Sequence, residues 1–112
     1  MSPDNRVLVV GTTPDYIEWI DRHCPGRGLF LTDPTLRQNA IEAAPDACSE
    51  LLADLTGSEN VWWKLAEHLD RWTIGLAGIA CFDDESMALA AILADRLDLP
   101  YPSGQAISRC RD

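Results

Sequence analysis

The segment "RVLVVGTTPDYIEWIDRHCPGRGLFLT", residues 6–32, decides the fold because it contains a complete strand–helix–strand unit. Residues 6–11 are a short apolar run that ends in glycine, and residues 28–32 are a second such run, as in the buried strands of a parallel sheet. Between the two runs, Thr13 can cap a helix and Pro14 suits its first position. This helix is expected to end at Pro25-Gly26 and to bury one apolar stripe, made of Tyr16, Ile17, Ile20 and Cys24.

The next part of the chain continues this alternation. Residues 33–45 predict a helix, because Asp33 can cap it, Pro34 suits its first position and Pro45 closes it. Residues 47–55, "ACSELLADL", fit either a helix by propensity or a short strand, and their periodicity does not decide between the two. Their position in an alternating pattern favours the strand.

The second half of the chain adds a helix, a strand and a further helix. Thr56 and Glu59 have the spacing of a capping box. Residues 77–82 predict a buried strand, and residues 83–100 predict a helix that is apolar almost all round over residues 87–93. The helix that starts near Thr56 is expected to present a broad apolar face, made of Val61, Trp62, Leu65, Leu69 and Trp72.

Alternating strands and helices with short connections indicate a parallel sheet joined by right-handed crossovers. We therefore expect an α/β fold of the Rossmann-like kind, a small open parallel sheet of about four strands in the order 3-2-1-4 with helices on both faces. The 112 residues suit a single domain, residues 1–112. Ser103 can cap a last helix over residues 103–112, and because no stop signal follows, the sequence is expected to end inside that helix.

The charge of the chain limits its partners. The formal net charge is −9, and Lys64 is the only lysine. Because binding to DNA or RNA needs cations that replace counterions on phosphates, a nucleic-acid partner is not expected. The opening residues, "MSPDNRVLVV", have neither the basic run of a signal peptide nor the length of a membrane span, which favours a cytoplasmic protein without a membrane partner.

The cysteines and histidines show no pattern of a metal site or a disulfide framework. They have neither a Cys-x-x-Cys pair nor the ligand spacing of structural zinc, so we expect no metal. One of them, Cys81, lies in an apolar run and is expected to be a small core residue. The six residues are Cys24, Cys48, Cys81, Cys110, His23 and His68.

Ligands of open parallel sheets bind at the carboxyl ends of the strands, where three loops of this chain are expected to meet. These loops are residues 11–15, 32–34 and 82–85. The first contains a single glycine, which argues against the glycine-rich motif of dinucleotide-binding proteins. The three loops hold carboxylates but no lysine or arginine, namely Asp15, Asp33, Asp83, Asp84 and Glu85.

Some of these carboxylates are expected to cap helices, because a negative charge offsets the positive end of a helix dipole. This applies to Asp33 and to one of the two aspartates at positions 83 and 84. Glu85 lies further along its loop, where a carboxylate can turn toward the crevice and accept a cationic or amine-bearing group. Thr12 and Thr13 can donate hydrogen bonds to a ligand oxygen, although capping alone also explains Thr13.

The sequence "AGIACFDDESMALAAILADRLDLPYPSGQAISRCRD", residues 77–112, resembles the closing stretch of the N-terminal domain of ATP-grasp ligases. In that superfamily a strand ends in a loop with an acidic residue, followed by an Ala-rich helix, an "lgLP-gps" turn and a helix that ends in Arg-Asp-Lys. Glu85 matches the acidic position, and the lysine would follow Asp112. The strand "VLVVG", residues 7–11, and its loop match the opening of the domain.

The resemblance implies a ligase that joins a carboxylate to an amine or a thiol through an acylphosphate formed from ATP. ATP and Mg²⁺ would bind between two later subdomains, so this domain would be inert alone. It would form one wall of the active site and contact a small-molecule carboxylate or amine substrate through Gly11, Thr12, Thr13 and Glu85. Residues 103–112 would lead to the ATP-grasp domains on which this domain packs, and family members often form homodimers.

Other interpretations stay open, since the loop Gly-Thr-Thr-Pro departs from the family's more Gly-rich turn. A freestanding Rossmann-like or receiver-like module that binds a partner protein would use the acidic loops, but a receiver also needs a lysine late in the chain, whereas Lys64 lies in a predicted helix. A truncated dehydrogenase domain is disfavoured by the single glycine of its first loop. Trp63 is expected either to be half-buried in the core or to face a neighbouring domain.

Overall fold

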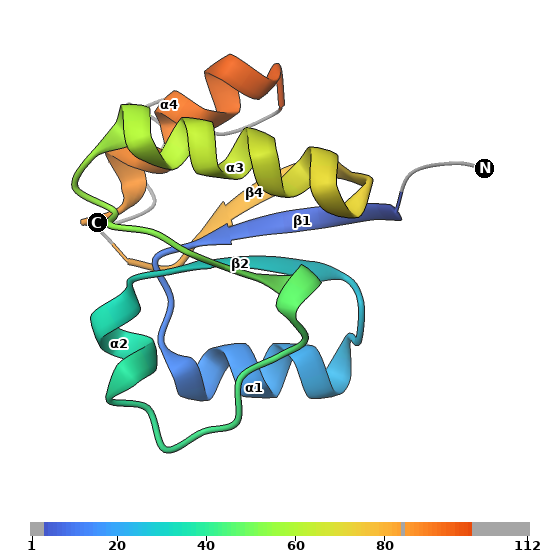
Figure 1. Ribbon diagram of the computed structural model, residues 1–112, viewed down its shortest axis with the longest axis vertical. Helices are drawn as coiled ribbons and strands as arrows, with labels where there is room; N and C mark the ends of the chain where they lie inside the picture. Colours follow the sequence, from blue (N-terminus) through green and yellow to red (C-terminus); the bar gives the residue numbers. More distant parts are fainter. Residues whose placement is uncertain (1–3, 84, 100–112) are drawn as a thin grey trace, which may run out of the picture.

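The computed structural model describes residues 4–83 and 85–99 of the chain (Figure 1). Four strands form one sheet in the order β3-β2-β1-β4, and every neighbouring pair is parallel. The predicted fold class and strand order are therefore confirmed, while the predicted helix of residues 103–112 lies outside the described residues. The strands are β1 (Asp4–Val10), β2 (Gly28–Thr32), β3 (Glu50–Leu52) and β4 (Ile74–Cys81).

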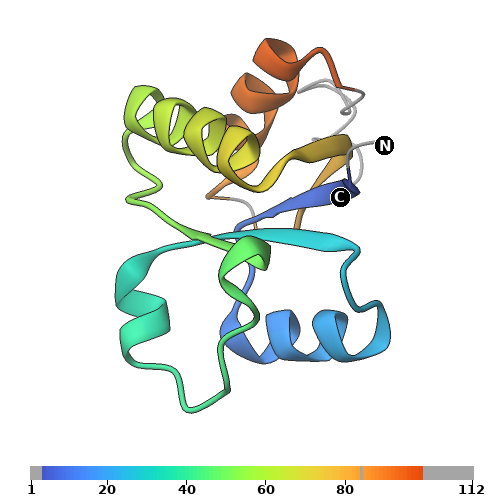
Figure 2. The same ribbon diagram turned by 45° about the vertical axis from the view of Figure 1, so that its right-hand side comes forward.

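Helices cover both faces of the sheet, as predicted (Figures 1 and 2). One layer contains α1 (Pro14–His23) and α2 (Pro34–Gln38), and the other contains α3 (Ser58–Trp72) and α4 (Met87–Leu97). A 3₁₀-helix, η1 (Ala47–Ser49), precedes β3. Right-handed crossovers explain the two layers. The chain moves along the sheet in one direction from β1 to β2 to β3, so the helices of these connections lie on one face. It then returns past β1 to β4, so the helix of that connection lies on the other face.

The core is divided by the sheet into two unequal parts, because side chains alternate between the faces along each strand. In the smaller part, Val9 of β1 and Phe30 of β2 pack against Ile17 of α1. In the larger part, Leu8 and Val10 face α3 and α4. The larger part is completed by Leu29, Leu31, Ala53, Val61, Leu65, Leu89, Ala90 and Leu93.

The helix α2 is much shorter than the predicted helix of residues 33–45. Asp33 caps it as predicted, since its carboxylate accepts a hydrogen bond from the amide of Thr35 at 2.8 Å, but the helix ends at Gln38. Past this end, Ile41 is almost completely exposed, so a longer helix would have no apolar side chain to bury there. Because short helices are stable mainly through packing, the chain leaves the helical path.

Residues 47–55 contain the short strand that their position favoured, rather than a helix. β3 pairs with β2 so that Leu51 lies opposite Leu31. Glu50, at the start of β3, forms an ion pair with Arg37 at 2.7 Å and accepts a hydrogen bond from the hydroxyl of Thr32 at 2.9 Å. These tertiary contacts override the helical propensity of the segment.

The predicted capping box of α3 is wrong. The helix begins at Ser58, with Gly57 at the N-cap position and no side-chain cap. The hydroxyl and the amide of Thr56 both donate to Oδ1 of Asp54, at 2.7 and 3.0 Å. Asp54 therefore closes a turn before the helix, and Thr56 takes part in that turn instead of capping α3.

The apolar face of α3 differs from the predicted one at its end. Val61 and Leu65 are buried as predicted, whereas Trp72 is exposed. The buried position in this last part belongs to His68, whose ring nitrogen Nε2 lies 3.0 Å from the carbonyl oxygen of Cys48. A histidine can fill this position because its buried polar atom has a hydrogen-bond partner.

The apolar side of α1 that is buried also contains fewer residues than predicted. Ile17 is buried and Ile20 is half-buried, but Tyr16 and Cys24 are exposed. The smaller core needs only the side of α1 that faces β1 and β2. The other apolar residues of α1 therefore remain on the surface.

The boundaries of the last two elements shift from their predicted positions. β4 begins at Ile74 rather than at residue 77, and α4 begins at Met87 rather than at residue 83. Cys81 is half-buried against the larger core, so its predicted core position is met only in part. Trp63 of α3 is 68 % exposed, which excludes the half-buried alternative.

Candidate functional site

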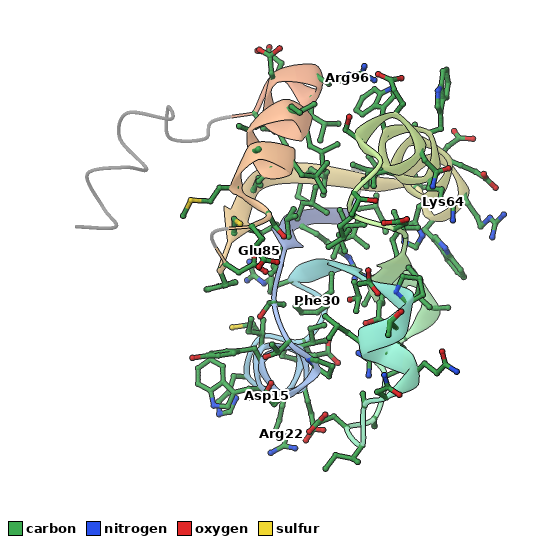
Figure 3. All side chains as sticks on the ribbon, turned by 90° about the vertical axis from the view of Figure 1, so that its left-hand side faces the viewer. Asp15, Arg22, Phe30, Lys64, Glu85 and Arg96 are labelled. Atoms are coloured by element: carbon green, nitrogen blue, oxygen red, sulfur yellow. The ribbon has the colours of Figure 1, made fainter. Side chains whose placement is uncertain are left out.

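Three loops follow β1, β2 and β4 at the carboxyl edge of the sheet, and Figure 3 is viewed toward this edge. In Figure 3, Glu85 lies level with the strand ends and Asp15 lies at the start of α1, on the side of the sheet that α1 covers. The predicted gathering of acidic residues at one edge is therefore visible for Asp15 and Glu85. The geometry of each loop decides which groups a ligand could reach.

The first and third loops are in direct contact at Gly11. This residue is buried and has a φ of +71°, and a Cβ atom at its position would lie 2.5 Å from Oγ of Ser86 and 2.6 Å from Oδ2 of Asp83. The amide of Phe82 also donates to the carbonyl oxygen of Val10 at 3.4 Å. Gly11 is therefore required by the close packing of the two loops, in addition to any contact with a ligand.

The two threonines of the first loop have different environments. Thr12 is 6 % exposed, and its hydroxyl has no hydrogen-bond partner among residues 4–83 and 85–99. Thr13 is exposed, and its hydroxyl donates to the carboxylate of Asp15. Thr13 occupies the N-cap position of α1, as predicted, but its side chain does not cap the helix. Thr12 is therefore the residue of this loop whose hydroxyl would gain most from a ligand, because a buried polar group without a partner costs about 1–3 kcal/mol.

Asp15 places a carboxyl group at the start of α1. The hydrogen bond from the Thr13 hydroxyl, supported by the amides of Asp15 itself and of Tyr16, lowers the pKa of the Asp15 carboxyl below its ordinary value of 3.8. The carboxylate is therefore ionised near neutral pH. Because it already lies at the positive end of the helix dipole, it opposes the binding of an anion there.

The third loop contains an aspartate that closes a turn and an exposed glutamate. Oδ1 of Asp83 accepts a hydrogen bond from the amide of Ser86 at 2.7 Å, but Ser86 is itself the N-cap residue of α4, and the helix has no side-chain cap. Asp83 therefore closes a turn before α4 instead of capping it, and Asp84 lies outside the described residues. Glu85 is exposed in the turn before this helix. Among the residues that the structure describes, no arginine or lysine forms an ion pair with Asp15, Asp83 or Glu85. The edge is therefore negative and open to a cation.

An aromatic pair at this edge was not predicted from the sequence. The rings of Tyr16 and Phe82 are stacked, with centroids 6.1 Å apart and planes at 9°. They are 55 % and 56 % exposed. The signal that could have found them is their position, since Tyr16 lies in the first turn of α1 and Phe82 directly follows β4. The apolar periodicity of α1 instead assigned Tyr16 to the core.

The described part of the chain holds no group of three or more histidine, cysteine, aspartate or glutamate side chains that could bind a metal ion. Cys24 and Cys48 are free thiols, the Cys81 thiol donates to the carbonyl oxygen of Asp83 at 3.1 Å, and Cys110 lies outside the described residues. What this edge offers is hydrogen-bond donors, carboxylates and aromatic rings. Such groups bind and orient a ligand, and they do not by themselves form a nucleophilic catalytic set.

Comparisons of the chain with family models, with curated proteins and with solved structures find no match. Within residues 4–83 and 85–99, none of the helices has the length and apolar character needed to cross a membrane.

Proposed function

We propose that this chain is the substrate-side N-terminal domain of a cytoplasmic ATP-grasp ligase, which joins a carboxylate to an amine or a thiol through an acylphosphate. The proposal starts from the resemblance of residues 77–112 and 7–11 to that family. It is supported by the parallel sheet in the order β3-β2-β1-β4 with helices on both faces, the Rossmann-like fold that the resemblance implies.

The observation that carries the proposal is the contact between the loops after β1 and β4. The resemblance implies that a substrate touches residues 11–13 and Glu85, which are far apart in the sequence. A Cβ atom on Gly11 would lie 2.6 Å from Oδ2 of Asp83, and Glu85 is in the same loop as Asp83. One small molecule could therefore contact both loops.

The chemistry of the two loops suits a substrate with an amine. Glu85 is exposed and Asp15 is ionised, and both can accept hydrogen bonds from an ammonium group. The hydroxyl of Thr12 is buried and has no partner among the described residues, so a substrate oxygen would accept its hydrogen bond only after the loop moves. In this proposal these residues bind and position the substrate, and the reacting phosphate comes from elsewhere.

The described residues of this edge do not fit ATP. Proteins bind a triphosphate with unpaired amides at a helix N-terminus, a Gly-rich loop and a lysine. Here Asp15 places a carboxylate at the start of α1, and Lys64 lies in α3, far from Asp15 and Glu85 in Figure 3. We therefore assign ATP and Mg²⁺ to the later subdomains that the resemblance implies, with this domain as one wall of the active site.

The position of Lys64 also argues against the receiver-like alternative. A receiver needs a lysine beside the acidic residues at the carboxyl edge of the sheet. Lys64 lines a groove with Leu51 and His68 at the β3 side of the domain instead. Among the residues that the structure describes, the acidic edge therefore has no lysine that could pair with a phosphorylated aspartate.

The reading frame beyond Asp112 gives the first test of the proposal. A lysine followed by a few hundred residues supports a ligase, and a stop codon contradicts it. The second test uses the full-length protein in an assay of ADP release with amine and carboxylate substrates. We expect Glu85→Gln to raise KM for the amine by about tenfold without changing KM for ATP, because a charge-assisted hydrogen bond is lost.

Glu67→Gln is the matched control for this assay. Glu67 is also an exposed glutamate, but it lies in α3 and pairs with Arg71 at 2.9 Å. We expect it to leave both KM values unchanged. Equal effects of the two substitutions, or an increase of KM for ATP in Glu85→Gln, would refute the assignment of Glu85 to the substrate.

A further inference from the structure

In the part of the chain that the structure describes, the face of the sheet that α1 covers is left open beneath β4. Val7 of β1 and Gly78 of β4 are neighbours in register and lie on this face. Val7 is 39 % exposed, and a Cβ atom on Gly78 would have no other atom within 4 Å. Ala77, next to Gly78, is exposed as well. Apolar sheet faces are normally covered by a second layer, but within residues 4–83 and 85–99 no element covers this floor of small residues.

The exposed side of α1 forms an aromatic wall beside this floor. Tyr16, Trp19 and His23 follow one another along one side of the helix, at helical spacing. Trp19 is 56 % exposed and stacks on His23, with ring centroids 4.4 Å apart. Tyr16 stacks on Phe82, which directly follows β4. The wall therefore runs along the side of α1 that borders β4.

The floor and the His23 end of the wall border a cavity of about 560 Å³. His23 and Cys24, at the end of α1, line it together with Val7 and Ala77 of the two strands. The other lining residues are Asn5, Arg6, Pro25 and Arg27. We call the whole surface between α1 and β4 the α1–β4 groove, made of Tyr16, Trp19, His23, Phe82, Val7, Ala77 and Gly78. Its small residues allow the backbone of a partner to approach closely, and its rings supply large contact areas.

The two ends of the groove differ in charge, because Arg6 and Arg27 line the end near His23, whereas carboxylates lie at the end near Phe82. Asp15, Asp83 and Glu85 lie at the end of the groove nearest Phe82, and no lysine or arginine of the described residues pairs with them. A second copy of the chain would bring the same carboxylates and a further net charge of −9. Like charges oppose such a pair, whereas a cationic partner is attracted.

We propose that the α1–β4 groove binds an amphipathic helix of a partner protein. The apolar side of that helix packs on Trp19 and Tyr16 and over Gly78, and its lysine or arginine side chains lie against Asp15 and Glu85. A helix fits because the missing layer of an α/β sheet is a layer of helices. This inference does not depend on the ligase proposal.

A synthetic peptide of about 18 residues, five helical turns, provides the probe. Leucine and alanine occupy one side of the peptide, and lysines occupy the first turn and the opposite side. A second peptide has glutamate in place of each lysine. Calorimetric titration of the 112-residue chain is expected to show at least about tenfold tighter binding of the lysine peptide, since the groove has an acidic end.

Substitutions in the chain distinguish the groove from general attraction between opposite charges. Trp19→Ala is expected to weaken binding of the lysine peptide by about tenfold or more, as the loss of an aromatic anchor does. Trp63→Ala is the matched control, because Trp63 is 68 % exposed but belongs to α3 on the other layer. It is expected to change the affinity less than about twofold.

Gly78→Val tests the floor of the groove separately. The added side chain meets open space in the free chain, so the urea midpoint of unfolding is expected to stay unchanged or to rise slightly. The same side chain occupies the volume of the docked helix and is expected to weaken binding at least about tenfold.

Three results would overturn the proposal. The first is equal loss of peptide affinity in Trp19→Ala and Trp63→Ala. The second is unchanged affinity in Gly78→Val. The third is a dimer in light scattering that dissociates in Trp19→Ala, because it would assign the groove to a second copy of this chain.

Discussion

Gly11 is the residue on which the geometry of the candidate site depends most. Its φ of +71° is unfavourable for any residue with a side chain, and its Cα faces Ser86 and Asp83 without room for a Cβ atom. The sequence motif "GTTPD" predicted a loop after a strand but did not show why glycine is needed there. The reason is a contact with a segment far along the chain, which only the fold reveals.

Gly11→Ala is expected to lower the free energy of unfolding by about 2–4 kcal/mol, because backbone strain and overpacking add. Urea unfolding followed by circular dichroism measures the change. Gly26→Ala is the control, since Gly26 has a similar φ of +74° but no atom within 4 Å of an added Cβ. It is expected to cost only about 1 kcal/mol. Equal losses in the two variants would show that the contact between the loops is absent.

Thr13→Val is expected to raise the pKa of Asp15 toward its ordinary value, because it removes the hydroxyl that donates to the carboxylate. Since the folded-state pKa is depressed, the ionised carboxylate stabilises the fold above pH 3.8, and this contribution disappears as the pH falls through the folded-state pKa. Titration of the carboxyl carbons by NMR measures the shift. Asp54, whose pKa is lowered by Thr56, is the internal control and is expected to titrate as in the parent chain.

At the scale of elements, α2 and β3 are held together by one ion pair. Arg37 of α2 and Glu50 of β3 lie 2.7 Å apart, with side chains only 12 % and 7 % exposed. Arg37 also donates to the carbonyl oxygen of Glu42 at 3.3 Å, in the segment that was predicted to continue the helix. The early end of α2 and the strand at residues 50–52 are thus linked by long-range contacts that no local pattern contains.

Arg37→Met is expected to destabilise the fold by about 3–5 kcal/mol, because it leaves the buried carboxylate of Glu50 without its cation. Arg71→Met is the control, since Arg71 pairs with Glu67 at a similar distance on an exposed surface. It is expected to cost less than about 1 kcal/mol. Thermal or urea unfolding of both variants makes the comparison, and similar losses would contradict the structural role of the buried pair.

At the scale of the whole molecule, the sequence predicted the architecture better than the surface. The apolar runs at residues 6–11, 28–32 and 77–82 identified three strands, and alternation correctly chose a strand within residues 47–55. The parallel sheet and its order followed from right-handed crossovers. Periodicity could not show that no described residue covers the sheet beneath β4, so Tyr16, which is exposed, was wrongly assigned to the core.

The candidate site was predictable only as a location. The rule for ligands at the carboxyl edge identified the loops of Thr12 and Glu85, which lie at that edge in the structure. The orientation of individual side chains at this edge was not predictable, because it depends on hydrogen bonds that form only in the folded loops. The carboxylate of Asp83 accepts a hydrogen bond from the amide of Ser86, and the hydroxyl of Thr13 donates one to the carboxylate of Asp15.

The division of labour between this domain and a nucleotide-binding part is the central claim, and calorimetric titration of residues 1–112 with MgATP tests it most directly. The carboxylate at the start of α1 and the distant Lys64 lead us to expect no binding up to about 1 mM, the weak end of useful affinities. A dissociation constant below about 1 mM would contradict the claim, because the triphosphate would then be held by this domain alone.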